Sequence, residues 1–152
     1  MRDILGSERI NVITDGLFGG NPHPRVYGAF PRVLDKYVRE ADLMSLEEAV
    51  RKMTSLPARS MGLDTKGFFR PGMDADLVVF DPDIFSSPAT YDNPRQHPKG
   101  IYHVLVDGEF VVRDGETTGA APARRSGRRV RVRVSSRRRP QWPQCRPARA
   151  GP

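Results

Sequence analysis

The last thirty residues limit how much of this 152-residue chain can fold. Residues 123–152 hold 11 arginines and no acidic side chain, whereas residues 1–122 hold 14 Lys and Arg and all 18 Asp and Glu. The net charge of +7 therefore divides into +11 for this tail and 14 − 18 = −4 for the rest. A run of like charges with scattered prolines is typical of disorder. We predict that the folded part ends near residue 122.

That length sets the scale of the fold. It suffices for one modest domain, but a complete α/β barrel typically needs about 250 residues. The chain has no run of 18 apolar residues, so we predict no membrane span. A single cysteine, Cys145, excludes an internal disulfide framework and predicts a cytoplasmic location.

The first half of the chain shows one short strand pattern and then helical periodicity. Residues 11–14 (NVIT) are rich in β-branched side chains and predict a buried strand, which ends at Asp15-Gly16. A loop rich in glycine and proline follows, over residues 16–25. Residues 33–38 then place apolar side chains at helical spacing.

A second helical pattern begins at Ser45. Residues 45–48 (SLEE) form a capping box, in which Ser45 accepts from the Glu48 amide and Glu48 reaches back. The apolar face of this helix is formed by Leu46, Ala49, Val50 and Met53. Pro57 opens a further short helix, and Gly62 is expected to end it in a left-handed conformation.

After residue 70 the periodicity changes to that of strands. Residues 75–81 (ADLVVFD) predict a strand that is buried on both faces in its middle. Residues 102–112 predict a hairpin, because Asp107-Gly108 is a two-residue type I′ turn signal between apolar runs. Residues 113–116 (RDGE) repeat the same turn chemistry.

Several segments together resemble the N-acyl-D-amino-acid deacylase (D-aminoacylase) family of the amidohydrolase superfamily. The most specific are residues 23–34 (HPRVYGAFPRVL) and 46–58 (LEEAVRKMTSLPA). Residues 70–81 (RPGMDADLVVFD) resemble a signature found across amidohydrolases, and residues 14–16, 89–94 and 104–108 complete the match. The resemblance covers residues 3–120, in order and without large gaps.

The resemblance implies a fold class of α/β plus β. The chain is expected to be a C-terminal fragment of a (β/α)8 metal-dependent amidohydrolase barrel, followed by part of an antiparallel β-sandwich and a disordered tail. Residues 1–66 would supply the last barrel strand, the substrate loop and helices. Residues 67–122 would belong to the small β-sandwich, and residues 123–152 would form the Arg-rich tail.

Two features depart from the family pattern. Thr14 stands where the family usually has serine, which keeps the hydroxyl. The family's zinc ligands are a His-x-His pair, a cysteine thiolate and two further histidines. None has a counterpart here, and His23, His97 and His103 do not fit those positions. The resemblance implies Zn in the full-length enzyme, with its ligands largely missing from this chain.

Asp15 is the candidate catalytic residue. Amide hydrolysis requires a carboxylate that takes a proton from water and passes it to the leaving amine. A residue at the carboxyl end of a barrel strand is well placed for this work. The resemblance makes Asp15 that general base and acid, linked to the metal through a metal-bound water. By pattern alone, Asp15-Gly16 also fits a simple turn.

Arg25, His23 and Tyr27 are the candidate substrate-binding residues. An N-acyl amino acid carries a free α-carboxylate, which the planar fork of Arg25 can bind with two hydrogen bonds. The alternative for Arg25 is a solvated arginine or one that pairs with Asp35. His23, a lone histidine between two prolines, fits a loop residue better than a metal ligand. Tyr27, with Phe30, fits a pocket wall or core packing.

The reaction implied is hydrolysis of a small-molecule N-acyl-D-amino acid to a D-amino acid and a carboxylate, with the isolated chain inactive. One alternative is a non-catalytic fragment that complements a separate barrel half. Unpaired edges and exposed apolar faces predict self-association. The other alternative is nucleic-acid binding through the basic tail, where Trp142 could stack on a base. No folded nucleic-acid-binding module accompanies that tail, so a solvated tail is preferred.

Overall fold

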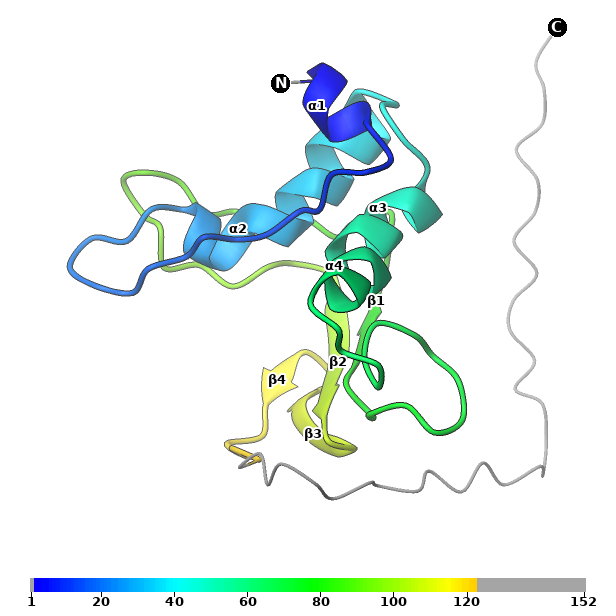
Figure 1. Ribbon diagram of the computed structural model, residues 1–152. Helices are drawn as coiled ribbons and strands as arrows, with labels where there is room; N and C mark the ends of the chain where they lie inside the picture. Colours follow the sequence, from blue (N-terminus) through cyan, green and yellow to red (C-terminus); the bar gives the residue numbers. More distant parts are fainter. Residues whose placement is uncertain (1, 123–152) are drawn as a thin grey trace, which may run out of the picture.

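The computed structural model describes residues 2–122, in which helices precede strands along the chain (Figure 1). The helices are α1 (Arg2–Gly6), α2 (Arg25–Arg32), the π-helix η1 (Val33–Glu40), α3 (Leu46–Met53) and α4 (Ser55–Ser60). The strands are β1 (Leu77–Phe80), β2 (Ile101–Val106), β3 (Glu109–Arg113) and β4 (Glu116–Thr117). They form one antiparallel sheet in the order β1-β2-β3-β4. The disorder predicted for residues 123–152, and the less favoured alternative that they bind nucleic acid, lie outside the described residues.

The predicted helix starting after Ser45 is confirmed as α3. The Ser45 hydroxyl accepts from the Glu48 amide at 3.2 Å, as the first half of a capping box requires. The Glu48 carboxylate instead pairs with Arg51, with Nε and Oε2 2.6 Å apart. At the end of the next helix, Gly62 has φ 68°, which confirms the predicted left-handed stop after α4.

The helix predicted over residues 33–38 is confirmed, but it is a π-helix that continues α2 without a break. Pro31 lies inside α2 and has no backbone N–H, so one α-helical hydrogen bond cannot form there. The wider π-helical winding begins two residues later, at Val33. Val33 and Leu34 are buried at the start of η1.

The hydrophobic core joins the helices to the chain beyond β1. Its buried centre consists of Val33, Leu34, Ala49 and Phe85, and partly buried side chains such as Val12 pack around it. Phe85 comes from the connection between β1 and β2. Arg39 of η1 donates to the carbonyl oxygens of Pro82 and Phe85, at 2.7 and 2.9 Å. These bonds fix the connection against the helices.

Both predicted Asp-Gly turns are confirmed. Asp107 and Gly108 have φ of 52° and 81°, and they join β2 to β3. Asp114 and Gly115 repeat this with 53° and 83°, and they join β3 to β4. Two successive positive φ values are what a type I′ turn requires, because its twist matches that of the flanking strands.

The strand predicted over residues 11–14 is wrong for this chain. Among the residues described, no strand pairs with it, and it runs as an irregular segment beside the helices (Figure 1). Only the Val12 amide bonds to the neighbouring backbone, donating to the Lys52 carbonyl at 3.0 Å. A strand forms only when a neighbouring strand supplies partners, and a segment's own pattern cannot supply them.

The surroundings of β1 also differ from expectation. Val78 and Val79 in its middle are 54% and 42% exposed rather than buried on both faces. Among the strands of residues 2–122, β1 pairs only with β2, so it is an edge strand of the described sheet. Residues 2–122 contain neither a closed barrel nor a second packed sheet. Within them no helix is both long and apolar enough to span a bilayer.

An ion network ties the loop before β1 to the first hairpin. Lys66 Nζ lies 2.9 Å from an oxygen of Asp74 and 2.5 Å from one of Asp76. Thr65 also donates to Asp74, at 3.0 Å. The other oxygen of Asp76 accepts from the Asp107 amide at 2.9 Å, so the network reaches the hairpin turn.

This network predicts a pH-dependent contribution to stability. The hydrogen bond from Lys66 lowers the pKa of Asp74 below its usual value. A lowered folded-state pKa stabilises the fold above the usual pKa, and this is lost as pH falls through the lowered value. Lys66→Met should therefore reduce the free energy of unfolding at neutral pH, with a gap to wild type that narrows on acidification. Urea unfolding at a series of pH values measures this gap.

The exposed Lys36 provides the matched control, because Lys36→Met removes the same charge away from the network. This variant should show no narrowing gap. A difference between wild type and Lys66→Met that stays constant into strong acid would contradict the assignment.

Candidate functional site

Asp15 and Arg25, predicted to act together on a substrate, form an ion pair. Arg25 Nη2 lies 3.3 Å from Asp15 Oδ2, and the two side chains are 45% and 71% exposed. Asp15 has φ 45°, a left-handed conformation that aspartate tolerates better than most residues. Asp35, the alternative partner considered for Arg25, instead pairs with Arg39 at 2.5 Å. The nine residues between Asp15 and Arg25 thus form a loop closed by opposite charges.

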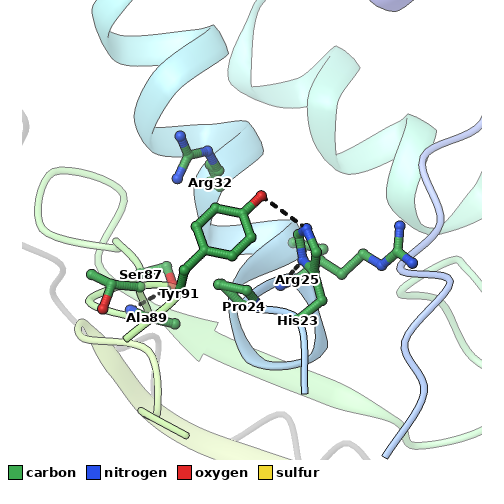
Figure 2. Close-up of a pocket in the computed structure, with 10 residues that line it drawn as sticks. His23, Pro24, Arg25, Arg32, Ser87, Ala89 and Tyr91 are labelled. Carbon is green, nitrogen blue, oxygen red and sulfur yellow. Dashed lines mark hydrogen bonds between the residues drawn. The ribbon is translucent and has the colours of Figure 1, made fainter. Parts of the chain in front are cut away.

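His23 fixes the backbone at the start of α2. Its Nδ1 accepts from the Arg25 amide at 3.0 Å, and its Nε2 lies 3.0 Å from the hydroxyl oxygen of Tyr91 (Figure 2). A neutral imidazole that accepts at Nδ1 carries its hydrogen on Nε2, so His23 donates to Tyr91. The two rings also meet edge to face, with centroids 5.0 Å apart. His23 therefore links the loop of Asp15 to the distant segment that holds Tyr91.

A pocket of about 390 Å³ lies beside this link, between the start of α2 and residues 87–91. Its polar lining comes from His23, Arg25, Arg32, Ser87, Thr90 and Tyr91. Figure 2 shows Arg25 extending to the side of His23 opposite Tyr91. Arg32 brings a positive charge to this lining, whereas the charge of Arg25 is paired with Asp15. A positive charge suits an anionic group. Asp15 is not among its lining residues.

Tyr27 is not among the residues that line this pocket. Its ring meets His97 edge to face at 5.8 Å between centroids, and Phe18 at 6.3 Å. Arg95 adds a further link by donating to the Gly20 carbonyl at 2.8 Å. The loop over residues 16–24 is thus held by side chains from the segment around residues 91–97, as Figure 1 shows for the two neighbouring loops.

The described residues do not fit a complete metal site. Within residues 2–122, no three His, Cys, Asp or Glu side chains come together in a group that could hold an ion. Of the other two histidines, His97 packs against Tyr27 and His103 accepts from the Asp114 amide at 3.2 Å. Asp15 is thus a lone carboxylate with an arginine partner.

Comparison with known proteins identifies the family of this chain. The sequence profile of the amidohydrolase family matches residues 11–112, which span the candidate site and the sheet down to β3. The chain belongs to the amidohydrolase family. Over 143 residues it is 45% identical to the N-acyl-D-glutamate deacylase of Alcaligenes xylosoxydans xylosoxydans. That alignment covers 93% of this chain and 28% of the relative, so this amidohydrolase chain spans about a quarter of its relative's length.

Solved structures agree on the branch of the family. A crystal structure of D-aminoacylase matches with a TM-score of 0.75 and 43% identity, covering 78% of this chain and 25% of that one. The N-acyl-D-glutamate deacylase of Bordetella bronchiseptica matches with 0.70 and 46%, covering 76% and 26%. That enzyme was crystallised with zinc and a phosphonate inhibitor that mimics the tetrahedral intermediate. The resemblance to N-acyl-D-amino-acid deacylases is confirmed.

Sequence reasoning missed the part of the site that comes from the β1–β2 connection. The site residues of this connection lie more than sixty positions from the loop over residues 16–24, and no local periodicity marks them. They are Ser87, Tyr91 and Arg95. Tyr91 begins the YDNP run within one of the matching segments, which was the only available signal. Arg32 lines the pocket from the last turn of α2 and was also missed.

Gly28 allows α2 to approach that connection. A Cβ atom at Gly28 would lie 2.1 Å from Ser87 Oγ and 2.8 Å from Ser87 Cβ, closer than real contacts allow. Gly28→Ala should therefore lower the free energy of unfolding by about 1–3 kcal/mol through overpacking. Thermal or urea unfolding measures this.

Gly19→Ala is the matched control, because a Cβ there meets nothing within 4 Å. Adding Ser87→Gly to Gly28→Ala should restore most of the lost stability. An unchanged stability in Gly28→Ala would show that the helix and the connection do not meet at Gly28.

Proposed function

We propose that this chain supplies a catalytic carboxylate and a substrate-binding arginine to an enzyme that hydrolyses N-acyl-D-amino acids. The products would be a D-amino acid and a carboxylate. The observation that carries this proposal is the 3.3 Å ion pair between Asp15 and Arg25 at the mouth of the closed loop. Each of these groups is what one end of such a substrate requires.

In the proposed reaction, Arg25 would exchange Asp15 for the α-carboxylate of the substrate. Asp15, released from its partner, would accept a proton from the attacking water and deliver it to the leaving nitrogen. The C–N bond of the amide breaks, the water oxygen bonds to the acyl carbon, and the amine leaves with the proton. Bound zinc would supply the activated water. Its ligands would lie outside residues 2–122, which contain no group of three candidate ligands.

His23 and Tyr27 would serve the same site indirectly. The His23 ring holds the Arg25 amide, and Tyr27 packs against the loop that links Asp15 to Arg25. The cytoplasmic location and the domain limits at residues 66 and 122 stay predictions.

The isolated chain should neither bind zinc tightly nor turn over substrate. Isothermal titration with Zn²⁺ and an assay with N-acetyl-D-methionine, N-acetyl-D-glutamate and N-acetyl-D-aspartate test this. Stoichiometric tight zinc binding together with release of amino acid from the purified chain would contradict the expectation.

Activity is expected when the chain is paired with a polypeptide that supplies the zinc ligands, including a His-x-His pair. In that enzyme, Asp15→Asn should lower kcat by about 10²–10⁴-fold, the usual worth of a general base. Arg25→Lys should mainly raise KM, because lysine cannot make the paired hydrogen bonds of a guanidinium. Arg59→Lys is the matched control, because Arg59 lies at the end of α4 and lines none of this site. Full activity in Asp15→Asn would remove the basis of the proposal.

The exposed apolar surface favours pairing with a further polypeptide. Ile13, Leu17 and Phe18 are 71%, 80% and 79% exposed around Asp15. Exposed apolar side chains of this kind mark surfaces that bind another protein. We infer that the partner of this surface is the portion of the barrel that the chain lacks. Without it the chain should self-associate through the same side chains.

Light scattering after size exclusion measures this self-association. The double variant Leu17→Ser, Phe18→Ser should shift the chain toward monomer. Phe69→Ser, at an 88% exposed position far along the sequence, is the comparison that locates the surface. A wild-type chain that elutes as a monomer and melts cooperatively would contradict the expectation.

A further inference from the structure

Lys52 is the one charged side chain that the described part of the chain buries completely. It lies in the last turn of α3 with a relative exposure of 0%. An ammonium group loses its hydration when it is buried, and this costs several kcal/mol unless oxygen atoms replace the water. The atoms around Lys52 Nζ therefore show which groups replace the water that the buried ammonium has lost.

Those atoms are backbone carbonyl oxygens of the N-terminal segment. Lys52 Nζ donates to the Leu5 carbonyl at 2.8 Å and also to the Ser7 carbonyl. Leu5 lies in the last turn of α1, which has no basic side chain of its own there. A cation at that place interacts favourably with the carbonyl end of the helix. Lys52 thus holds α1 and the residues just after it.

The backbone of the same residue holds the next part of the segment. The Lys52 carbonyl accepts from the Val12 amide at 3.0 Å, three positions before Asp15. Arg51 contributes between these points, because its Nη2 donates to the Glu8 carbonyl at 2.6 Å. Two consecutive residues of α3 therefore bind the backbone of residues 5–12, which pairs with none of the described strands.

Glu48 holds these two cations in place. It lies one turn earlier on α3, with its oxygens 2.6 and 2.8 Å from Arg51 and 3.9 Å from Lys52 Nζ. The hydrogen bond from Arg51 lowers the pKa of the Glu48 carboxyl, so Glu48 stays ionised. We call Glu48, Arg51 and Lys52 the α3 clamp.

We propose that Lys52 is a positioning residue for Asp15, which it serves by fixing the backbone of residues 5–12 through the α3 clamp. This inference rests on the proposed role of Asp15. The connection along the chain is short. The Val12 amide is bound to the Lys52 carbonyl and the Val12 side chain packs against the core. Only Ile13 and Thr14 separate Val12 from Asp15. Arg25 then pairs with a carboxylate whose backbone is already placed.

Lys52→Met in the full chain tests the proposal, because methionine keeps the apolar stem and removes the ammonium. Hydrogen exchange of residues 4–13 should become about tenfold faster, the loss expected for one charge-assisted hydrogen bond. Exchange of the hairpin over residues 101–113 should not change. Lys36→Met, at an exposed position, is the matched control and should change neither region.

The carboxyl ¹³C resonance of Asp15 separates positioning from general support. It should shift in Lys52→Met and keep its wild-type position in Lys36→Met. Unchanged exchange over residues 4–13, or an unmoved Asp15 resonance in a folded Lys52→Met chain, would overturn the proposal.

A second measurement applies to the wild-type chain, so it does not depend on whether the variant folds. Amine acetylation followed by peptide mass spectrometry should modify Lys52 at least about tenfold more slowly than Lys36, because a buried ammonium reacts only after local opening. Equal rates would overturn the proposal. Neither experiment uses enzyme activity, so an intact clamp in an enzyme that shows no deacylation would count against the proposed function alone.

Discussion

The buried ammonium of Lys52 is the interaction on which the arrangement of the N-terminal half depends. Residues 5–12 pair with no strand in the part of the chain that the structure describes, and buried backbone carbonyls need hydrogen-bond partners. Lys52 satisfies two of these carbonyls with its side chain, and its own carbonyl accepts from Val12. The cost of burying a charge is offset because every contact of that charge is an oxygen or a nearby carboxylate.

The core extends this arrangement toward the candidate site. Ala49, one turn before Lys52 on α3, contributes to the same buried cluster as Val33, Leu34 and Phe85. Phe85 leads into the connection that carries Tyr91, and Arg39 binds that connection through two carbonyls. The loop between Asp15 and Arg25 is thereby held from both sides, by α3 near Val12 and by Tyr91 and Arg95 at its far end. An exposed loop rich in glycine acquires a defined path in this way.

The candidate site contains an ion pair but, within the described residues, no group of metal ligands. The chain spans about a quarter of the deacylases it resembles, and large apolar side chains next to Asp15 in the sequence are exposed. This is why we assign the reaction to a larger assembly.

The sequence by itself determined the elements whose signals are local. The cap at Ser45, the stop at Gly62 and the two Asp-Gly turns formed as predicted, because each depends on a few adjacent residues and their own φ values. The family followed from local runs as well. Only the tertiary structure decided that residues 11–14 stay outside any sheet, that Lys52 is buried, and that Tyr91 reaches His23. The burial of Lys52 and the contact of Tyr91 depend on partners from distant parts of the chain. The state of residues 11–14 depends on a partner strand that the described residues lack. Periodicity within a segment carries no information about such partners.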